Sequence, residues 1–490
     1  MAETSTIFGF MKYVSATDIL SDFKKTVDSH FVNSLRYRKI SFYFLGVLIM
    51  YTKEQLKRLL IPLMFEQVLT ALMGSVDTIM VTNIGSAAIS AVSLVDSLNI
   101  LIINIFAAMA TGGAIICAQY LGSNQKEKAN QALKQLIFSV TLISILITIP
   151  CILFRKPLLT LIFGSVEKSV MDNSLSYLYI TALSYPFIAL YNAGAASFRT
   201  SQNSRLPMAI AFGSNILNIL GNIFFIFTLS LGVSGAALST LLSRIISALI
   251  ILLLLKQPKQ DLYVDSYLSI RPEFQGIQQI LKIGIPTGIE NGMFQFGKLV
   301  IQSTVSTMGT TAIAAQAMVA MLESFACQAS IGIGLGMMTV VGKCVGAKEY
   351  EQARHYTILL TKYAWIACFI CCAMILFPIK QITSLAGMEA ESAKLAIWLT
   401  RIVFTYKMIF WTPSFLPGYG LRAAGDVKFS MITSTLSMWI CRVVVTIFLV
   451  HTFHMGPIAV WIGMGADWTI RSFIFLARFK SNKWLEHKVI

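Results

Sequence analysis

Carboxylates inside long apolar stretches are the residues of this chain whose type and spacing could do chemistry. Glu66 and Asp77 lie 11 residues apart in one stretch, which at about 100° per residue places them on nearly one face of a helix. Glu290 lies in a second stretch and is followed by Asn291 and Gln295. Burying a charged carboxylate in hydrocarbon is costly, so such residues commonly handle ions or substrates. We therefore expect sites for protons, small cations or a transported compound.

Each acid also has a structural interpretation, which the residues alone leave open. Asp77 would then lie near a helix end or accept a hydrogen bond from a buried hydroxyl group. Glu66 would pair with Lys57 or Arg58 near the membrane interface. Glu290 would form an ion pair with a side chain on another helix. The elements that hold these acids decide between the two interpretations.

Composition identifies these elements as membrane-spanning helices. The chain has 490 residues, of which 56% are hydrophobic and 13% are charged, and its mean hydropathy is +0.71. Soluble domains carry about 25% charged residues, and the apolar runs here reach the roughly 20 residues that cross a bilayer. The net charge of +16 comes from lysines and arginines spread over short loops, which predicts topology rather than nucleic-acid binding.

Twelve membrane-spanning helices are predicted, and the excess of basic residues in alternate loops places both termini in the cytoplasm. The predicted spans cover residues 57–82, 87–120, 127–153, 169–198, 205–230, 233–256, 280–307, 311–343, 350–377, 389–421, 427–451 and 456–479. The predicted domains are an N-terminal cytoplasmic or interfacial segment, a six-helix bundle, a cytoplasmic linker, a second six-helix bundle and a cytoplasmic tail, at residues 1–56, 57–256, 257–279, 280–480 and 481–490. Met50 offers an alternative start, so we leave open whether residues 1–49 belong to the native protein.

The two halves of the chain repeat each other at a constant offset of 224 residues. Pro62 and Glu66 match Pro286 and Glu290, and glycines follow the same offset: Gly85 and Gly309, Gly112 and Gly336, Gly122 and Gly346, and Gly194 and Gly418. Six spans per half return the chain to the same side of the membrane. The halves are therefore predicted to be parallel repeats around a central cleft, an arrangement suited to alternating access.

Further polar residues lie within the predicted spans. Glu323 aligns with Asn99 under the repeat, and either residue could line a polar cavity or hydrogen-bond between helices. Asn192 could face a cavity of the N-terminal half or bond to a neighbouring helix. Basic residues within or near spans are expected mostly to neutralise acids or reach the interfaces. They are Arg244, Lys298, Arg401, Lys407, Arg442 and Arg471.

Several sequence blocks share their order and spacing with a known family. The N-terminal half contains Gly74-Ser-Val-Asp77 and Ala118-Gln-Tyr-Leu-Gly122. The C-terminal half contains Gly309-Thr-Thr-Ala-Ile-Ala-Ala-Gln316 and Gly420-Leu-Arg-Ala-Ala-Gly-Asp426. Over about residues 55–480 these blocks resemble the multidrug and toxic compound extrusion (MATE) family of the multidrug/oligosaccharidyl-lipid/polysaccharide flippase superfamily.

The resemblance implies two six-helix bundles that export drugs or toxic, mainly cationic or amphiphilic, organic compounds in exchange for inward H⁺ or Na⁺. Asp77 matches the first-helix aspartate linked to cation coupling in one branch of the family. Glu66 and Asn192 are the other ion-coupling candidates, and a Na⁺ site near Asp77 is left open. Some members carry an acid in the tenth helix, where this chain has Tyr406-Lys407. This departure leaves the coupling ion open.

The resemblance also supplies candidates for substrate binding. Glu290 looks like the acid found in the seventh helix of other members, where it is linked to cation or substrate binding. Asn291, Gln295 and Glu323 complete this set of candidates. We expect a monomeric secondary active transporter in the cytoplasmic (inner) membrane, with a small-molecule substrate and the lipid bilayer as partners. No nucleic acid and no cofactor other than the coupling ion are expected.

Two alternatives belong to other functional classes. A flippase for lipid-linked oligosaccharide, or a polysaccharide exporter, would use the same scaffold and would be favoured by a cationic central cavity, because its substrates carry phosphates. An intramembrane enzyme is the third hypothesis. No phosphate loop, HExxH motif or nucleophile elbow occurs in a supporting context, so the sequence gives no argument for ATP-driven transport or hydrolysis.

Overall fold

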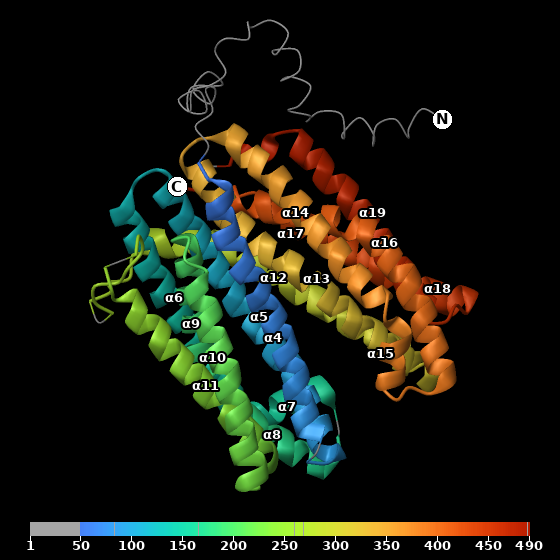
Figure 1. Ribbon diagram of the computed structural model, residues 1–490. Coiled ribbons are helices and arrows are strands. Elements are labelled where there is room, and N and C mark those ends of the chain that lie inside the picture. Colours follow the sequence, from blue (N-terminus) through green and yellow to red (C-terminus); the bar gives the residue numbers. More distant parts are fainter. Residues whose placement is uncertain (1–49, 83, 165, 259, 268, 488) are drawn as a thin grey trace, which may run out of the picture. The chain divides into compact units, whose positions relative to one another are not determined.

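The computed structural model describes residues 50–490 apart from positions 83, 165, 259, 268 and 488 (Figure 1). The segment predicted at residues 1–56 therefore lies outside the described residues up to position 49. Residues 51–490 form one compact unit, and its regular elements are helices throughout the described part of the chain. This confirms the predicted all-α class.

Eight helical segments of the described residues are long and apolar enough to cross a membrane by themselves. They are α4 (Lys53–Thr82), α5 (Ser86–Gly122), α6 (Lys126–Leu153), α10 with η1 (Arg205–Asn222 and Ile223–Thr228), α11 (Gly232–Leu255), α13 (Thr310–Gly346), α14 (Tyr350–Leu376) and α17 with η2 and α18 (Val427–Leu436, Ser437–Val444 and Val445–Phe453). The short elements η1 and η2 are π-helical turns.

Helices also cover the other four predicted spans. These are α8 with α9 (Lys168–Leu183 and Tyr185–Thr200), α12 (Phe274–Ser306), α16 (Ala390–Ala423) and α19 (Ile458–Lys480). Ser184 separates α8 from α9, so the fourth predicted span is two shorter helices in series. Each predicted span thus corresponds to a helix or to consecutive helices, while the crossing number of twelve stays a prediction.

Two short helices, α7 (Arg155–Phe163) and α15 (Ile379–Leu385), were not predicted. They follow α6 and α14 respectively, so they occupy equivalent places in the two repeats. Pro157 lies in the first turn of α7 and Pro378 directly precedes α15. Proline suits these positions because its missing N–H is not needed at the start of a helix.

The first helix of each half also packs against the second helix of the other half. The α4 helix packs against α13 of the other half, and α12 packs against α5, while α5 and α13 also contact each other (Figure 1). Glycines permit these close approaches: a Cβ on Gly112 would lie 2.9 Å from the Gly284 nitrogen, and one on Gly336 would lie 2.6 Å from the Leu60 side chain. These two contacts are related by the 224-residue repeat.

A tight seam joins the ends of α5 and α13. A Cβ on Gly122 would overlap the carbonyl oxygen of Lys343, and a Cβ on Gly346 would overlap that of Gln119. The Gln119 side chain also donates a hydrogen bond from Nε2 to the Ala423 carbonyl across the seam at 2.9 Å. The halves are therefore closed against each other at this end, which is the predicted cytoplasmic end.

The connection between halves folds back onto the N-terminal bundle. Lys126 pairs with Asp261 at 2.9 Å, and Lys134 pairs with Asp265 at 3.0 Å. Gln135 Nε2 donates to the Arg271 carbonyl at 2.8 Å. The connection thus lies along α6, and α12 begins at Phe274, within the predicted linker of residues 257–279.

Candidate functional site

Asp77 lies half-buried on α4, inside the N-terminal bundle. Its Oδ1 accepts a hydrogen bond from Asn222 Nδ2 at 2.8 Å. Asn222 ends α10 and also donates to Asn218 Oδ1 at 3.2 Å, while Asn218 Nδ2 donates to Thr240 Oγ1 on α11 at 3.3 Å. The Asn222 Oδ1 atom is buried without a hydrogen-bond partner among the described residues. A carboxylate and an unused amide oxygen therefore lie together between three helices.

A second carboxylate, Asp96 on α5, belongs to the same interior. Its Oδ1 accepts hydrogen bonds from Asn99 Nδ2 at 3.0 Å and from the Tyr177 hydroxyl at 3.3 Å. Tyr185, the first residue of α9, donates from its hydroxyl to Asn99 Oδ1 at 2.7 Å. Asp96 thus joins α5 to α8, and Asn99 joins α5 to α9, through interhelical hydrogen bonds of the kind common in membranes.

Arg244 on α11 is the basic member of this interior. Its guanidinium donates to Ser184 Oγ at 2.7 Å and interacts electrostatically with both Asp77 and Asp96. We call Asp77, Asp96, Asn222 and Arg244 the N-half polar cluster. With both acids ionised, its two carboxylates and one guanidinium leave a net charge of −1. One bound proton or monovalent cation would neutralise the cluster.

An apolar layer covers the N-half polar cluster toward the far ends of α4 and η1. Val81 follows Asp77 by one turn of α4 and Ile226 follows Asn222 by one turn, and both are buried. They pack in one hydrophobic cluster with residues of α5, α8 and α11. The polar side chains are therefore separated from that end of the bundle by hydrocarbon, which strengthens electrostatic interactions among them.

Glu66 forms an ion pair with Arg199, the penultimate residue of α9, at 2.5 Å. The Glu66 side chain is 4% exposed and that of Arg199 is 16% exposed. Glu66 Oε2 and Arg199 Nε are both buried without a hydrogen-bond partner in the described part of the chain. The partner predicted from sequence, Lys57 or Arg58, is therefore not the one that the fold supplies.

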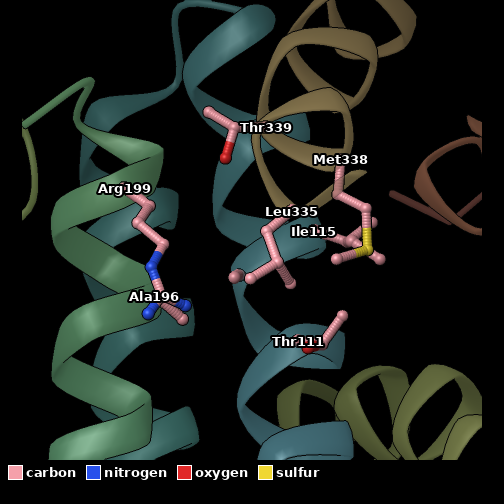
Figure 2. A pocket seen from close by; sticks show the side chains of 8 residues that line it. Thr111, Ile115, Ala196, Arg199, Leu335, Met338 and Thr339 are labelled. Atoms are coloured by element: carbon pink, nitrogen blue, oxygen red, sulfur yellow. The ribbon is translucent and has the colours of Figure 1, made fainter. Parts of the chain in front are cut away.

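A small cavity adjoins this ion pair at the boundary between the halves. Figure 2 shows Arg199 and Ala196 of α9 on one side, Thr111 of α5 below, and Thr339 of α13 above. Its volume is about 20 Å³, which suffices for about one water molecule. The Arg199 guanidinium thus faces α13, a helix of the opposite half.

The three residues predicted for ion coupling lie in separate surroundings. Asn192 is on α9, and its Nδ2 atom is buried without a hydrogen-bond partner among the described residues. No hydrogen bond or ion pair recorded within the described residues links Asp77, Glu66 and Asn192 to one another. Asp77 with Asn222 is accordingly the candidate ion site, and the coupling roles of Glu66 and Asn192 stay predictions.

Glu290, the repeat equivalent of Glu66, lies half-buried on α12. Its Oε2 atom is 3.7 Å from Arg422 Nη1 and accepts a hydrogen bond from Ser430 Oγ at 3.4 Å. The Arg422 guanidinium also lies over the Tyr419 ring, 4.6 Å from its centroid. Like Glu66, Glu290 forms an ion pair with an arginine of another helix, as its structural interpretation predicts. Its role in substrate binding stays a prediction.

The remaining substrate-binding candidates divide between two helices. Asn291 and Gln295 lie half-buried on α12, on the same helix as Glu290. Glu323 on α13 accepts a hydrogen bond from Lys407 Nζ at 2.6 Å, and the Glu323 carbonyl accepts a second one at 2.8 Å. Lys407 is fully buried. Lys407 of α16, which stands where some family members carry an acid, therefore neutralises Glu323 of α13.

Sequence reasoning missed Asn222, although a signal was present. Asn215, Asn218 and Asn222 follow one another at spacings of three and four residues, which place them on one face of a helix. That amide face identifies α10 as a wall of a polar interior. The pairing of this face with Asp77 could not be read from spacing, because 145 residues separate Asp77 from Asn222.

The geometry of two equivalent bundles agrees with a comparison against family models. The MatE family model matches twice, at residues 62–224 and 286–448, so the two matches repeat the offset of the halves. The chain belongs to the MatE family. This family membership confirms that the chain is a multi-pass membrane transporter rather than an enzyme, and its relatives include proteins named for multidrug resistance and for multidrug and toxin extrusion.

Known proteins similar to this chain span nearly its whole membrane part. The uncharacterized transporter YisQ of Bacillus subtilis is 26% identical over 87% of this chain and 93% of its own length. The probable multidrug resistance protein NorM of Thermotoga maritima is 25% identical over 89% of this chain and 94% of its own length. A solved outward-facing conformation of a multidrug resistance MATE family transporter of the MOP superfamily matches with a TM-score of 0.81 and 21% identity, covering 88% and 96% of the two chains. The last comparison establishes the fold.

Proposed function

We propose that this member of the MatE family exports small organic compounds across the cytoplasmic membrane in exchange for H⁺ or Na⁺. The driving ion moves inward, where the membrane potential favours it. Both termini lie in the cytoplasm, and a single chain is the transporting unit. The probable multidrug resistance protein NorM supports export of toxic compounds as the direction of transport.

The observation that carries the proposal is the uncompensated charge of the N-half polar cluster. Asp77 and Asp96 share one arginine, Arg244, in an interior closed by hydrocarbon. Neutralising one carboxylate reduces the cost of keeping the cluster buried. Protonated Asp77 would also supply the donor that the buried Asn222 Oδ1 lacks. Na⁺ is served by the same atoms, because it prefers oxygen ligands.

Ion binding must favour one of two conformations for transport to be coupled. The Gly122 and Gly346 seam closes the predicted cytoplasmic end in this conformation, as expected of an outward-facing transporter. In the opposite conformation the seam opens and the far ends of the bundles approach each other. Asp77 lies toward the far end of α4. Neutralising Asp77 would therefore change the relative stability of the two conformations.

Flux measurements on the full-length chain in proteoliposomes test this function. Export of ethidium, a cation, and of 8-anilinonaphthalene-1-sulfonate, an anion, would be followed under imposed H⁺ or Na⁺ gradients. We expect an inward ion gradient to accelerate export of at least one dye several-fold over protein-free liposomes. Equal rates with and without both gradients would contradict ion-coupled exchange.

A flippase or exporter of phosphate-bearing lipids is the second candidate function. It is favoured by the basic side chains inside the C-terminal bundle, namely Lys298, Lys407, Arg442 and Arg471. Their arrangement bears on the charge of the transported compound, whichever of the two functions is correct.

A further inference from the structure

Two basic side chains of the C-terminal bundle converge on one aromatic ring. Lys298 Nζ lies 5.1 Å from the centroid of the Phe294 ring, and Arg442 Cζ lies 5.3 Å from it. Each contact is a favourable cation–π interaction. The two positive charges repel each other, however. A bound anion that contacts both groups would offset this repulsion.

The acids of the bundle are already engaged with other bases. Glu323 receives the hydrogen bonds of Lys407, and Asp467 receives two from Arg471 Nη2, at 2.7 and 3.0 Å. Lys298 interacts electrostatically with Glu323, and Arg442 with Asp467, but neither base has a carboxylate within 4.0 Å in the described residues.

Four basic and two acidic side chains therefore give this interior a net charge of +2. The basic members are Lys298, Lys407, Arg442 and Arg471, and the acidic members are Glu323 and Asp467. The pair of Glu290 and Arg422 is itself balanced and adds no net charge. The N-half polar cluster has the opposite sign, so the two bundles differ in the ion that they attract.

The two converging bases differ in exposure. Lys298 is exposed, although α13, α16 and η2 place charged residues around it. Arg442 is only 5% exposed, and its Nε atom has no hydrogen-bond partner among the described residues. A buried guanidinium donor without an acceptor is unusual, since buried polar groups are nearly always hydrogen-bonded.

Local backbone structure brings the two bases together. Arg442 lies in η2, a π-helical turn, and such turns occur frequently at functional sites. A Cβ on Gly297 of α12 would lie 2.5 Å from Met438 Cε and 3.4 Å from the Val443 side chain. Glycine at this position therefore allows η2 to approach α12 one residue before Lys298.

We propose that Lys298 and Arg442 bind the anionic group of the transported compound. The compound is an organic anion, with a carboxylate, sulfonate or phosphate group on an apolar or aromatic body. Its body contacts Phe294 and Phe415, whose rings meet edge to face at 6.3 Å. This inference rests on the proposed export function, and it replaces the mainly cationic substrate that the family resemblance implies with a compound of opposite charge.

A binding measurement tests the proposal without any ion gradient. Equilibrium dialysis would compare 4-methylumbelliferyl phosphate with its uncharged parent 4-methylumbelliferone, using full-length protein in phosphatidylcholine nanodiscs and subtracting empty nanodiscs. We expect the phosphate to bind at least about tenfold more tightly than the parent compound. Ethidium is expected to bind more weakly than the phosphate. Equal binding of phosphate and parent compound would overturn the proposal.

Variants assign the binding to these side chains. Lys298→Gln is expected to lower affinity for the phosphate about tenfold, Lys298→Arg to retain it, and Lys298→Glu to invert the preference toward ethidium. Lys394→Gln, which removes an exposed lysine at the start of α16, is the matched control and should bind as the wild type does. Because Lys298 is exposed, these variants should fold even if Arg442→Gln does not. The same affinity in Lys298→Gln and Lys394→Gln would reject the site.

The source of the anion is resolved by adding phosphatidic acid to the nanodiscs. Competition by this lipid would indicate a lipid phosphate as the ligand. No competition would indicate a soluble organic anion. Failure of the inference and of the export function are distinguishable. Anion binding without gradient-driven flux would reject coupled export alone, whereas coupled flux of ethidium without anion binding would reject the anion site alone.

Discussion

Asn222 donates a hydrogen bond to Asp77 at 2.8 Å while its own side-chain oxygen lies buried with no donor among the described residues. The amide thus stabilises the carboxylate in its charged form and also offers an acceptor to an incoming proton or Na⁺. A single side chain can serve both states of the ion site, because its two polar atoms have opposite hydrogen-bonding character.

Asn222→Ala is therefore expected to slow gradient-driven export about tenfold, the scale of one hydrogen bond to a charged group. The charged carboxylate loses its donor, so release of the ion becomes less favourable. Substrate binding measured without a gradient should change little. Asn215→Ala removes the same type of side chain about two turns earlier on α10 and should leave export near the wild-type rate. Similar losses in both variants would argue for a general effect on α10.

The seam between the halves predicts an effect on conformation. Gly346→Ala places a methyl group against the Gln119 carbonyl, so the closed seam must separate. We expect the predicted cytoplasmic end to close less tightly, which longer distances between spin labels on α5 and α13 would show. We also expect loss of most export activity. Gly213→Ala on α10 meets no atom within 4 Å and should preserve both. Unchanged label distances in Gly346→Ala would refute the seam.

The Glu66 and Arg199 ion pair predicts an effect on stability. Removing one member of a buried pair leaves the other charge uncompensated and costs about 3–5 kcal/mol. Glu66→Gln and Arg199→Gln should each lower the free energy of unfolding by this amount in detergent titrations, and the double variant should recover part of it. Asp261→Asn breaks an exposed pair with Lys126 and should cost less than about 1 kcal/mol. Equal stability of Glu66→Gln and Asp261→Asn would contradict the assignment.

The linker predicts a pH effect outside the membrane. The hydrogen bond from Lys134 holds the pKa of Asp265 below its ordinary value. A depressed pKa stabilises the docked linker above the ordinary pKa of an aspartate, and this contribution disappears as pH falls through the folded value. Amide exchange in residues 256–273 should therefore increase below about pH 4. In Asp265→Asn, exchange of the same residues should not depend on pH once intrinsic exchange rates are corrected for. If the increase below about pH 4 persists in this variant, the pH effect arises from a group other than Asp265.

The repeat offset explains how much of the fold was accessible from sequence. Matching glycines at positions 112 and 336, and at 122 and 346, recur where the halves touch, because an added Cβ would crowd the backbone or side chains of the other half. Helix positions followed from hydrophobic length, since a bilayer requires about 20 apolar residues. The break at Ser184 and the helices α7 and α15 were missed, because short helices in apolar sequence have no length signal of their own.

The partners of the buried acids were not accessible in the same way. Glu66 pairs with a residue 133 positions away, and Glu323 with one 84 positions away. No periodicity reports contacts at such separations. Equal positions in the repeat also proved chemically unequal: Asn99 accepts from the Tyr185 hydroxyl, whereas Glu323 binds the Lys407 ammonium. The opposite charge balance of the two bundles arises from such differences.

The central claim is that Asp77 carries the coupling ion. The most direct measurement is gradient-driven dye export by Asp77→Asn in proteoliposomes, compared with wild type at equal protein incorporation. Because asparagine keeps the shape but cannot bind a proton, we expect dye to move only down its own gradient, with no response to imposed H⁺ or Na⁺. Export by Asp77→Asn that still accelerates under an inward ion gradient, to the wild-type extent, would contradict the account.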